Sequence, residues 1–115
     1  MSLLLFRIAA ALCFLAVASG AFGAHALKST LELRGTLHAW HTAVLYHFIH
    51  AIALLVLALY GMTSRAAWWL IFTGIVLFSG SLYVISLTNL RWLGFVTPLG
   101  CVCFLAGWAW LIIAR

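Results

Sequence analysis

The sequence predicts an all-α integral membrane protein, an antiparallel bundle of four transmembrane helices. Of its 115 residues, 68% are hydrophobic, and the mean hydropathy is +1.26. Only 6% are charged, whereas soluble domains typically carry about 25%. The chain also contains four apolar runs of about 20 residues, the length that crosses a bilayer. Strands are excluded because a lipid-exposed sheet edge would leave backbone groups unpaired.

The four apolar runs predict spans at residues 3–24, 39–60, 67–87 and 93–113. The linkers 61–65 and 88–91 are short, which forces neighbouring spans to be antiparallel. The segment 26–37 is the clearly polar linker, and its alternation of leucines and charges is compatible with a helix lying along the membrane surface. The length allows a single transmembrane domain, residues 1–115. Four spans would place both termini on the same side of the membrane.

The charged residues predict contact with lipid headgroups. The chain has six basic residues and one acidic residue, Glu32, which gives a net charge of +5. The basic residues are scattered and lie mostly near the ends of apolar runs, so they suit a lipid bilayer and not a nucleic acid. Three fall on each side of the membrane, so the positive-inside rule gives no orientation: Arg7, Arg65 and Arg115 on one side, and Lys28, Arg34 and Arg91 on the other.

The second span has two chemically different faces. At about 100° per residue, Tyr46, His47 and His50 fall on one face, which we expect to contact the other helices. His38 and His41 project the opposite way and are expected at the membrane surface. The remaining large side chains form a face that should contact lipid: Leu45, Phe48, Ile49, Ile52, Leu55, Val56 and Leu59.

A polar layer is expected near the level of the two histidines, in the half of the membrane below the loop that begins at His25. The candidate ligand or proton-path residues are His25, Tyr46, His47, His50, Ser79, Ser81 and Thr97. Ionisable residues inside a membrane are often functional. The alternative is that these side chains join helices by hydrogen bonds. For the histidines, the expected partners are hydroxyls or carbonyls of other helices: Ser19, Ser79, Ser81, Thr97 or a carbonyl freed by Pro98.

Catalytic motifs are scarce, and the sequence argues against an enzyme without excluding one. A single acid rules out mechanisms that need two carboxylates, and there is no phosphate-binding or dinucleotide motif. Cys13, Cys101 and Cys103 lie inside apolar runs and are expected to be free thiols. No carboxylate accompanies His47 and His50 in the membrane, so we predict no metal site and no cofactor, although haem ligation by the two histidines remains open.

Several segments carry a resemblance to a known family. They are GAFGAHALK at 20–28, Tyr46-His47 with His50-Ala51, GIVLFSGSLY at 74–83, TPLG at 97–100, and Gly107-Trp108. Together they resemble the DUF423 family, also grouped as UPF0382, over essentially the whole chain. The resemblance implies a small multi-pass protein of the bacterial inner membrane, and it implies no activity.

Three classes of function remain open. The first is an accessory or scaffolding subunit that packs against a larger membrane complex or against copies of itself. The second is a carrier or channel for protons or a small solute that uses the polar layer. The third, least supported, is an intramembrane enzyme or cofactor-binding protein. A water-accessible cavity reaching His47 would favour the carrier, and a closed bundle with an exposed face of small residues would favour the subunit.

Overall fold

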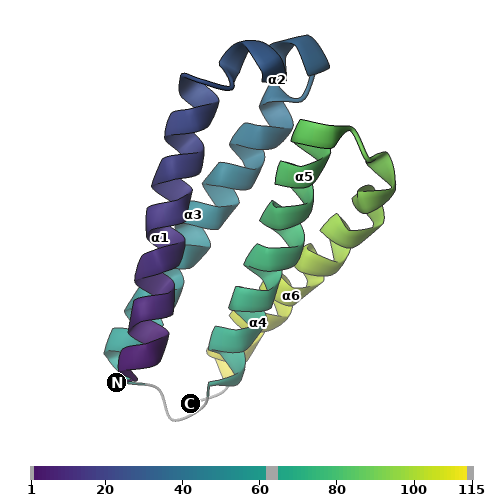
Figure 1. Ribbon diagram of the computed structural model, residues 1–115. Coiled ribbons are helices and arrows are strands. Elements are labelled where there is room, and N and C mark those ends of the chain that lie inside the picture. Colours follow the sequence, from purple (N-terminus) through teal and green to yellow (C-terminus); the bar gives the residue numbers. More distant parts are fainter. Residues whose placement is uncertain (1, 62–64, 114–115) are drawn as a thin grey trace.

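The computed structural model describes residues 2–61 and 65–113, and every regular element in these ranges is helical. The prediction of an all-α membrane fold is confirmed, because four helical stretches are long and apolar enough to cross a bilayer. The stretches are Leu3–Ala24, Leu37–Tyr60, Ala66–Thr88 and Arg91–Ile113. They alternate in direction, so the start of the first and the end of the fourth lie at the same end of the bundle (Figure 1).

The first two spans are single α-helices joined by a short third helix. Helix α1 (Leu3–Ala24) begins after Ser2, whose hydroxyl accepts a hydrogen bond from the Leu5 amide. Helix α2 (Lys28–Arg34) crosses the end of the bundle (Figure 1) and buries Leu31 beneath it. Gly35, in the left-handed conformation that suits glycine, ends α2, and α3 (Leu37–Tyr60) follows.

The last two spans are each interrupted, which the continuous apolar runs did not reveal. The third consists of α4 (Ala66–Gly74), a π-helical turn η1 (Ile75–Ser79) and α5 (Gly80–Thr88). The fourth begins as a 3₁₀ turn, η2 (Arg91–Phe95), and continues as α6 (Val96–Ile113). Pro98 is the third residue of α6, where a missing N–H costs no helical hydrogen bond.

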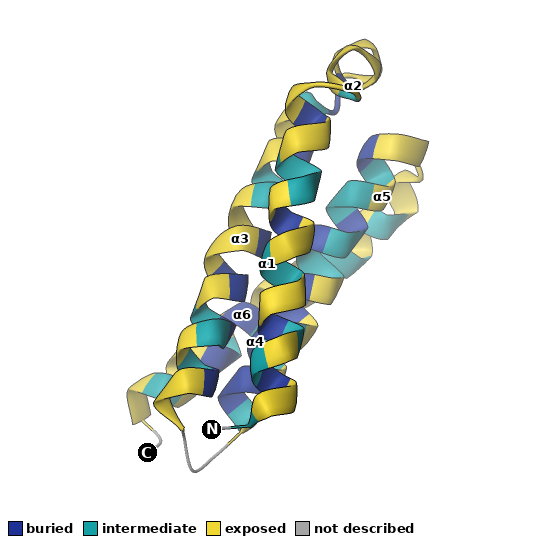
Figure 2. Cartoon of the chain, turned by 60° about the vertical axis from the view of Figure 1, so that its left-hand side comes forward, coloured by how far each residue is buried: buried dark blue, intermediate teal, exposed yellow. Residues whose placement is uncertain are grey.

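Helix α3 lies at the centre of the arrangement. It packs against α1, α4, η1 and α5, while α6 packs mainly against α4 and η1. The core contains Leu54 of α3, Ile71 of α4 and Phe104 of α6, together with Leu5 and Ala9 of α1. Figure 2 shows buried residues on the sides of the helices that face one another and exposed residues on the outer sides. The apolar outer surface is what a bilayer would cover.

Glycines bring α6 into backbone contact with the third span. A Cβ atom added to Gly100 would overlap the backbone of Phe78 in η1, and one added to Gly74 would overlap the ring of Phe104. In contrast, a Cβ atom added to Gly80 would have no neighbour within 4 Å. Small residues allow membrane helices to approach this closely, so Gly100 sets the distance between α6 and η1.

We expect Gly100→Ala to lower the free energy of unfolding by about 1–3 kcal/mol, because the added methyl group must displace backbone. Gly80→Ala is the matched control and should leave stability unchanged or raise it slightly, since alanine favours the helix. Thermal unfolding of both variants in mild detergent, followed by loss of the monodisperse species, measures the difference. Equal behaviour of the two variants would contradict the close contact.

Candidate functional site

The buried polar side chains lie on the inner faces of the helices, as the face assignment of the second span predicted. His47 is 4% exposed and His50 is 7% exposed. Phe48, Ile52 and Leu59, expected to contact lipid, are 40%, 44% and 56% exposed. The two histidines therefore face inwards as predicted and these three side chains face outwards, whereas Leu55, also expected to contact lipid, is half-buried and packs against the core.

Two different partners hold His50 in a single protonation state. Its Nδ1 lies 2.8 Å from the carbonyl oxygen of Tyr46, which can only accept a hydrogen bond, so Nδ1 carries the hydrogen. The indole Nε1–H of Trp108 donates to His50 Nε2 at 3.0 Å, which requires a lone pair there. His50 is thus the neutral Nδ1–H tautomer. A second proton on Nε2 would oppose the indole N–H, so His50 is poorly suited to carry protons.

His47 has a less constrained environment between α1, α3 and α5. Its Nδ1 lies 2.8 Å from the hydroxyl oxygen of Tyr83, a group that can donate or accept. Its Nε2 is buried without a hydrogen-bond partner of normal geometry among the described residues, although the Leu12 carbonyl of α1 lies towards it. The Ser19 side chain lies within reach of the Tyr83 hydroxyl. Ser19, Tyr83 and His47 therefore form a short polar chain across three helices.

The hydroxyl groups of the third and fourth spans pair around the π-helical turn. Ser79 donates to the carbonyl of Ala43 in α3 at 2.8 Å, which ties η1 to the central helix. Ser81 donates to the carbonyl of Phe78 at 3.0 Å. Ser81 also lies 2.5 Å from the Thr97 hydroxyl of α6. Because the single hydrogen of Ser81 is already used, Thr97 is the donor in this second bond.

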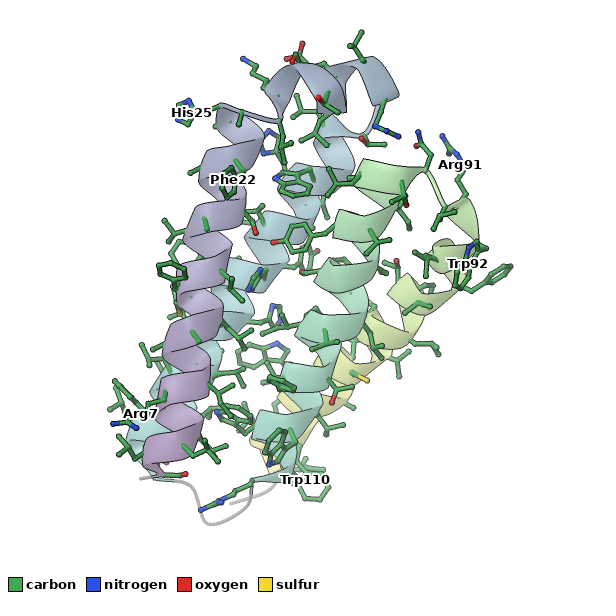
Figure 3. The ribbon with its side chains drawn as sticks, viewed as in Figure 1. Arg7, Phe22, His25, Arg91, Trp92 and Trp110 are labelled. Atoms are coloured by element: carbon green, nitrogen blue, oxygen red, sulfur yellow. The ribbon has the colours of Figure 1, made fainter. Side chains whose placement is uncertain are left out.

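Of the other candidate residues, His25 stands apart from these groups, while Tyr46 lies against His50. His25 follows the end of α1, is exposed and points away from the bundle (Figure 3). Tyr46 is 40% exposed, and its ring packs on Phe78, Phe104 and His50. His38 and His41 are exposed near the start of α3. The candidate residues thus lie in separate groups, and they do not converge on one site.

The predicted partners of the two histidines were wrong in identity, although His47 does pair with a hydroxyl of another helix. Tyr83 and Trp108 take the places expected for Ser19, Ser79, Ser81 or Thr97. Counting about 1.5 Å per residue places Tyr83 several ångströms nearer the membrane surface than His47. Long side chains bend towards the N-terminus of their own helix, and this brings Tyr83 to the level of His47. Adding this direction to the depth count would have identified the pair.

The described part of the chain holds no metal cluster, and the groove on its surface lies away from the two buried histidines. No group of three His, Cys, Asp or Glu residues within 2–61 and 65–113 could hold a metal ion. A groove of about 340 Å³ lies on the outer surface of α1. None of the buried polar residues lines it; its lining is Ala18, Ala21, Phe22, His25 and Ala26. The arrangement can therefore join helices, and the groove on α1 does not reach His47 or His50.

A double-mutant cycle tests the bond between α3 and α5. His47→Leu and Tyr83→Phe are expected to be non-additive, with a coupling free energy of about 0.6 kcal/mol and at most ~1.7 kcal/mol. The control cycle combines Tyr83→Phe with His50→Leu, which should be nearly additive because His50 pairs with Trp108. Unfolding free energies in mixed detergent give both values. A coupling indistinguishable from the control would mean that His47 and Tyr83 do not interact.

The protonation state of His50 can be observed directly. In nitrogen-15 spectra at neutral pH, His50 is expected to show a protonated Nδ1 and an unprotonated Nε2. Trp108→Phe removes the donor to Nε2 but leaves the bond from Nδ1–H to the Tyr46 carbonyl, so the tautomer should persist while the Nε2 resonance shifts because its hydrogen bond is lost. Trp110→Phe is the control, because none of the hydrogen bonds or ring contacts of His50 among the described residues involves Trp110, and it should leave the spectrum unchanged. An Nε2–H tautomer in the unmodified protein would refute the assignment.

Comparison with known proteins gives a family and no structural match. The family described as "Protein of unknown function (DUF423)" matches residues 19–101. The UPF0382 membrane protein YwdK of Bacillus subtilis is 48% identical over 106 residues, covering 87% of this chain and 85% of that protein. The UPF0382 inner membrane protein YgdD of Escherichia coli K12 is 44% identical over 108 residues, covering 87% and 79%. No solved structure matches the chain. The chain therefore belongs to the DUF423 family of membrane proteins, whose function is unknown, as the resemblance in its sequence implied.

Proposed function

We propose that this protein is an accessory or self-associating subunit of the inner membrane, which acts by packing against other membrane-embedded helices. The observation that carries the proposal is that three of its intramembrane polar side chains, His50, Ser79 and Ser81, are hydrogen-bonded within the chain. His50 uses both ring nitrogens, and Ser79 and Ser81 donate to carbonyls of the bundle. Side chains that are hydrogen-bonded in this way stabilise the bundle. They leave few free donors or acceptors that could bind a transported proton or solute.

The exposed surface of α1 supports the same role. Helix α1 packs against α3 and α2, so most of its circumference faces outwards. Among its exposed residues are Ala10, Ala11 and Ala21. Membrane helices have no hydrophobic driving force for association. Small residues let them approach closely, and the resulting van der Waals packing stabilises the contact instead. A subunit would use such a face to bind another helix.

The proposed topology follows from the four spans and the relatives. With four spans, both termini lie on one side of the membrane, and α2 lies at the opposite surface. The name of the Escherichia coli relative includes the inner membrane, and this supports the same membrane for the present chain. Reporter fusions to the two ends distinguish this topology from one with an odd number of spans.

A second candidate function, a proton or small-solute carrier, is favoured by one observation. The buried Nε2 of His47 lacks a regular partner, and Nδ1 contacts a hydroxyl that can exchange roles as donor and acceptor. A proton could therefore be taken up at His47 without breaking its bond to Tyr83. This candidate ranks second because the groove found in the described part of the protein does not reach His47.

Association in the native membrane tests the proposed function. Chains carrying a fluorescent tag at the C-terminus are counted by stepwise photobleaching in membrane nanodiscs, and proteins that co-purify are identified by mass spectrometry. We expect two or more copies, or a stable membrane partner, in each particle. Single copies without any partner would contradict the subunit role. In that case, a proton flux into liposomes that is lost in His47→Leu would support the carrier.

A further inference from the structure

The buried polar side chains lie in one half of the bundle, between its middle and helix α2. Among the residues that the structure describes, they are Thr36, His47, His50, Ser79, Ser81 and Ser86. The core of the other half is apolar and contains Leu5, Ala9, Leu54, Ala58 and Ile71. The indole N–H of Trp68, which also lies there, is bonded to the Leu54 carbonyl. Among these residues, a polar route to the buried histidines therefore exists on the α2 side and not on the other.

Three side chains form this route, which passes from α1 through α5 to α3. At about 1.5 Å per residue, Ser19 lies about 8 Å from the α2 end of α1, and His47 lies about 15 Å from the start of α3. Ser19 and Tyr83 are half-buried, and the Ser19 side chain lies within reach of the Tyr83 hydroxyl. That hydroxyl is 2.8 Å from His47 Nδ1. The route thus begins near the membrane surface and ends at a buried imidazole near the middle of the bundle.

The surroundings of His47 suit both its neutral and its protonated form. Its Nε2 is buried beside the Leu12 carbonyl and has no partner of normal geometry among the described residues. Because a carbonyl can only accept, a hydrogen on Nε2 is favoured, and Nδ1 then accepts from the Tyr83 hydroxyl. A second hydrogen, on Nδ1, would be donated to the Tyr83 oxygen. Each N–H of the protonated ring would therefore face an oxygen atom, whereas at His50 one N–H would oppose the indole of Trp108.

From this arrangement we infer that His47 binds a proton that enters from the α2 side along Ser19 and Tyr83. Water adds a proton to Ser19 Oγ, the original Ser19 hydrogen passes to the Tyr83 oxygen, and the original Tyr83 hydrogen passes to His47 Nδ1. Afterwards each bond of the chain runs in the opposite direction, from Nδ1–H to Tyr83 and from Tyr83 to Ser19.

The proton stops at His47, because the core beyond this residue is apolar. The site therefore responds to acidity at one membrane surface and conducts no proton to the other. This activity goes beyond the subunit role and does not depend on it, and it differs from that of a carrier, which needs access from both sides.

Few titratable groups surround His47. Tyr83 is the one that α5 brings to it, and α4 and η1 contain none. Helix α1 contributes Cys13, which is half-buried against the core, and Arg7, which is directed away from the bundle (Figure 3). On α3, His50 lies one turn away, and both of its ring nitrogens are already bonded. The single acidic residue of the chain is exposed on α2, as are the basic residues of that helix. His47 is therefore the group on this route that can hold an added proton.

Nitrogen-15 spectra of histidine-labelled protein in lipid nanodiscs test the site, with His47→Gln to assign its resonances. At neutral pH, His47 is expected as the Nε2–H tautomer. Below the range of about pH 5–8 in which histidines ordinarily change charge, both of its nitrogens should carry hydrogen, while His50 keeps its Nδ1–H form. An Nδ1–H tautomer of His47 at neutral pH would overturn the proposal. A ring that stays neutral down to the pH at which the bundle unfolds would do the same.

The rate at which His47 exchanges its added proton with solvent, obtained from the line shapes of the same spectra, tests the route. Tyr83→Phe and Ser19→Ala each interrupt the chain of hydroxyls and should slow this exchange by about tenfold or more. Ser81→Ala is the matched control, because it removes a buried hydroxyl that bonds elsewhere, and it should leave the rate unchanged. The same rate in all three variants would overturn the route.

A pH gradient across liposomes that contain the protein and an internal pH-sensitive dye tests whether the far half is closed. The gradient should decay at the same rate with the unmodified protein and with His47→Leu, because the proton stops at His47. A faster decay with the unmodified protein would overturn the one-sided site and support the carrier. The number of copies in each particle bears on the subunit role alone, so the two proposals can fail separately.

Discussion

The lack of water in the bilayer core is the constraint on which this structure depends. A polar group buried there must find its partner inside the protein, and helix α3 supplies a partner to every other span. It accepts hydrogen bonds at its carbonyls and histidine, and it donates one through an indole. The bonds are Trp40 to the Ser19 carbonyl of α1, Trp68 of α4 to the Leu54 carbonyl, Ser79 of η1 to the Ala43 carbonyl, and Trp108 of α6 to His50.

The spans are held at two different distances by two kinds of side chain. Between the third span and α6, glycines allow backbone contact, as at Gly100 and Phe78. Between α1 and α5, aromatic side chains fill the space: the rings of Trp40 and Tyr83 lie 4.8 Å apart. Each ring also carries a polar atom that bonds to a neighbouring helix. Aromatic residues with a polar group thus provide both separation and specific attachment.

The fold and the orientation of α3 could be predicted because both follow from the apolar pattern of the sequence. The spans read from hydropathy begin and end within two residues of those in the structure, and the histidines face inwards. The pairings could not be predicted, because depth counted along a helix ignores how far Tyr83 and Trp108 reach. The π turn was also missed, since its residues are as apolar as those of an α-helix.

The π-helical turn determines how one span can serve two neighbours. The Gly80 amide bonds to the Ile75 carbonyl, five residues earlier, so the turn holds one residue more than an α-helical turn. This shifts the helical phase of α5 relative to α4 by about 100°. As a result, α4 presents Gly74 to α6, while α5 presents Tyr83 to α3. Deleting one residue here would restore a regular helix, yet it would rotate either α4 or α5 out of register with its neighbour. The number of residues in this span is therefore constrained by the contacts of α4 and α5 with their neighbours, in addition to the thickness of the bilayer.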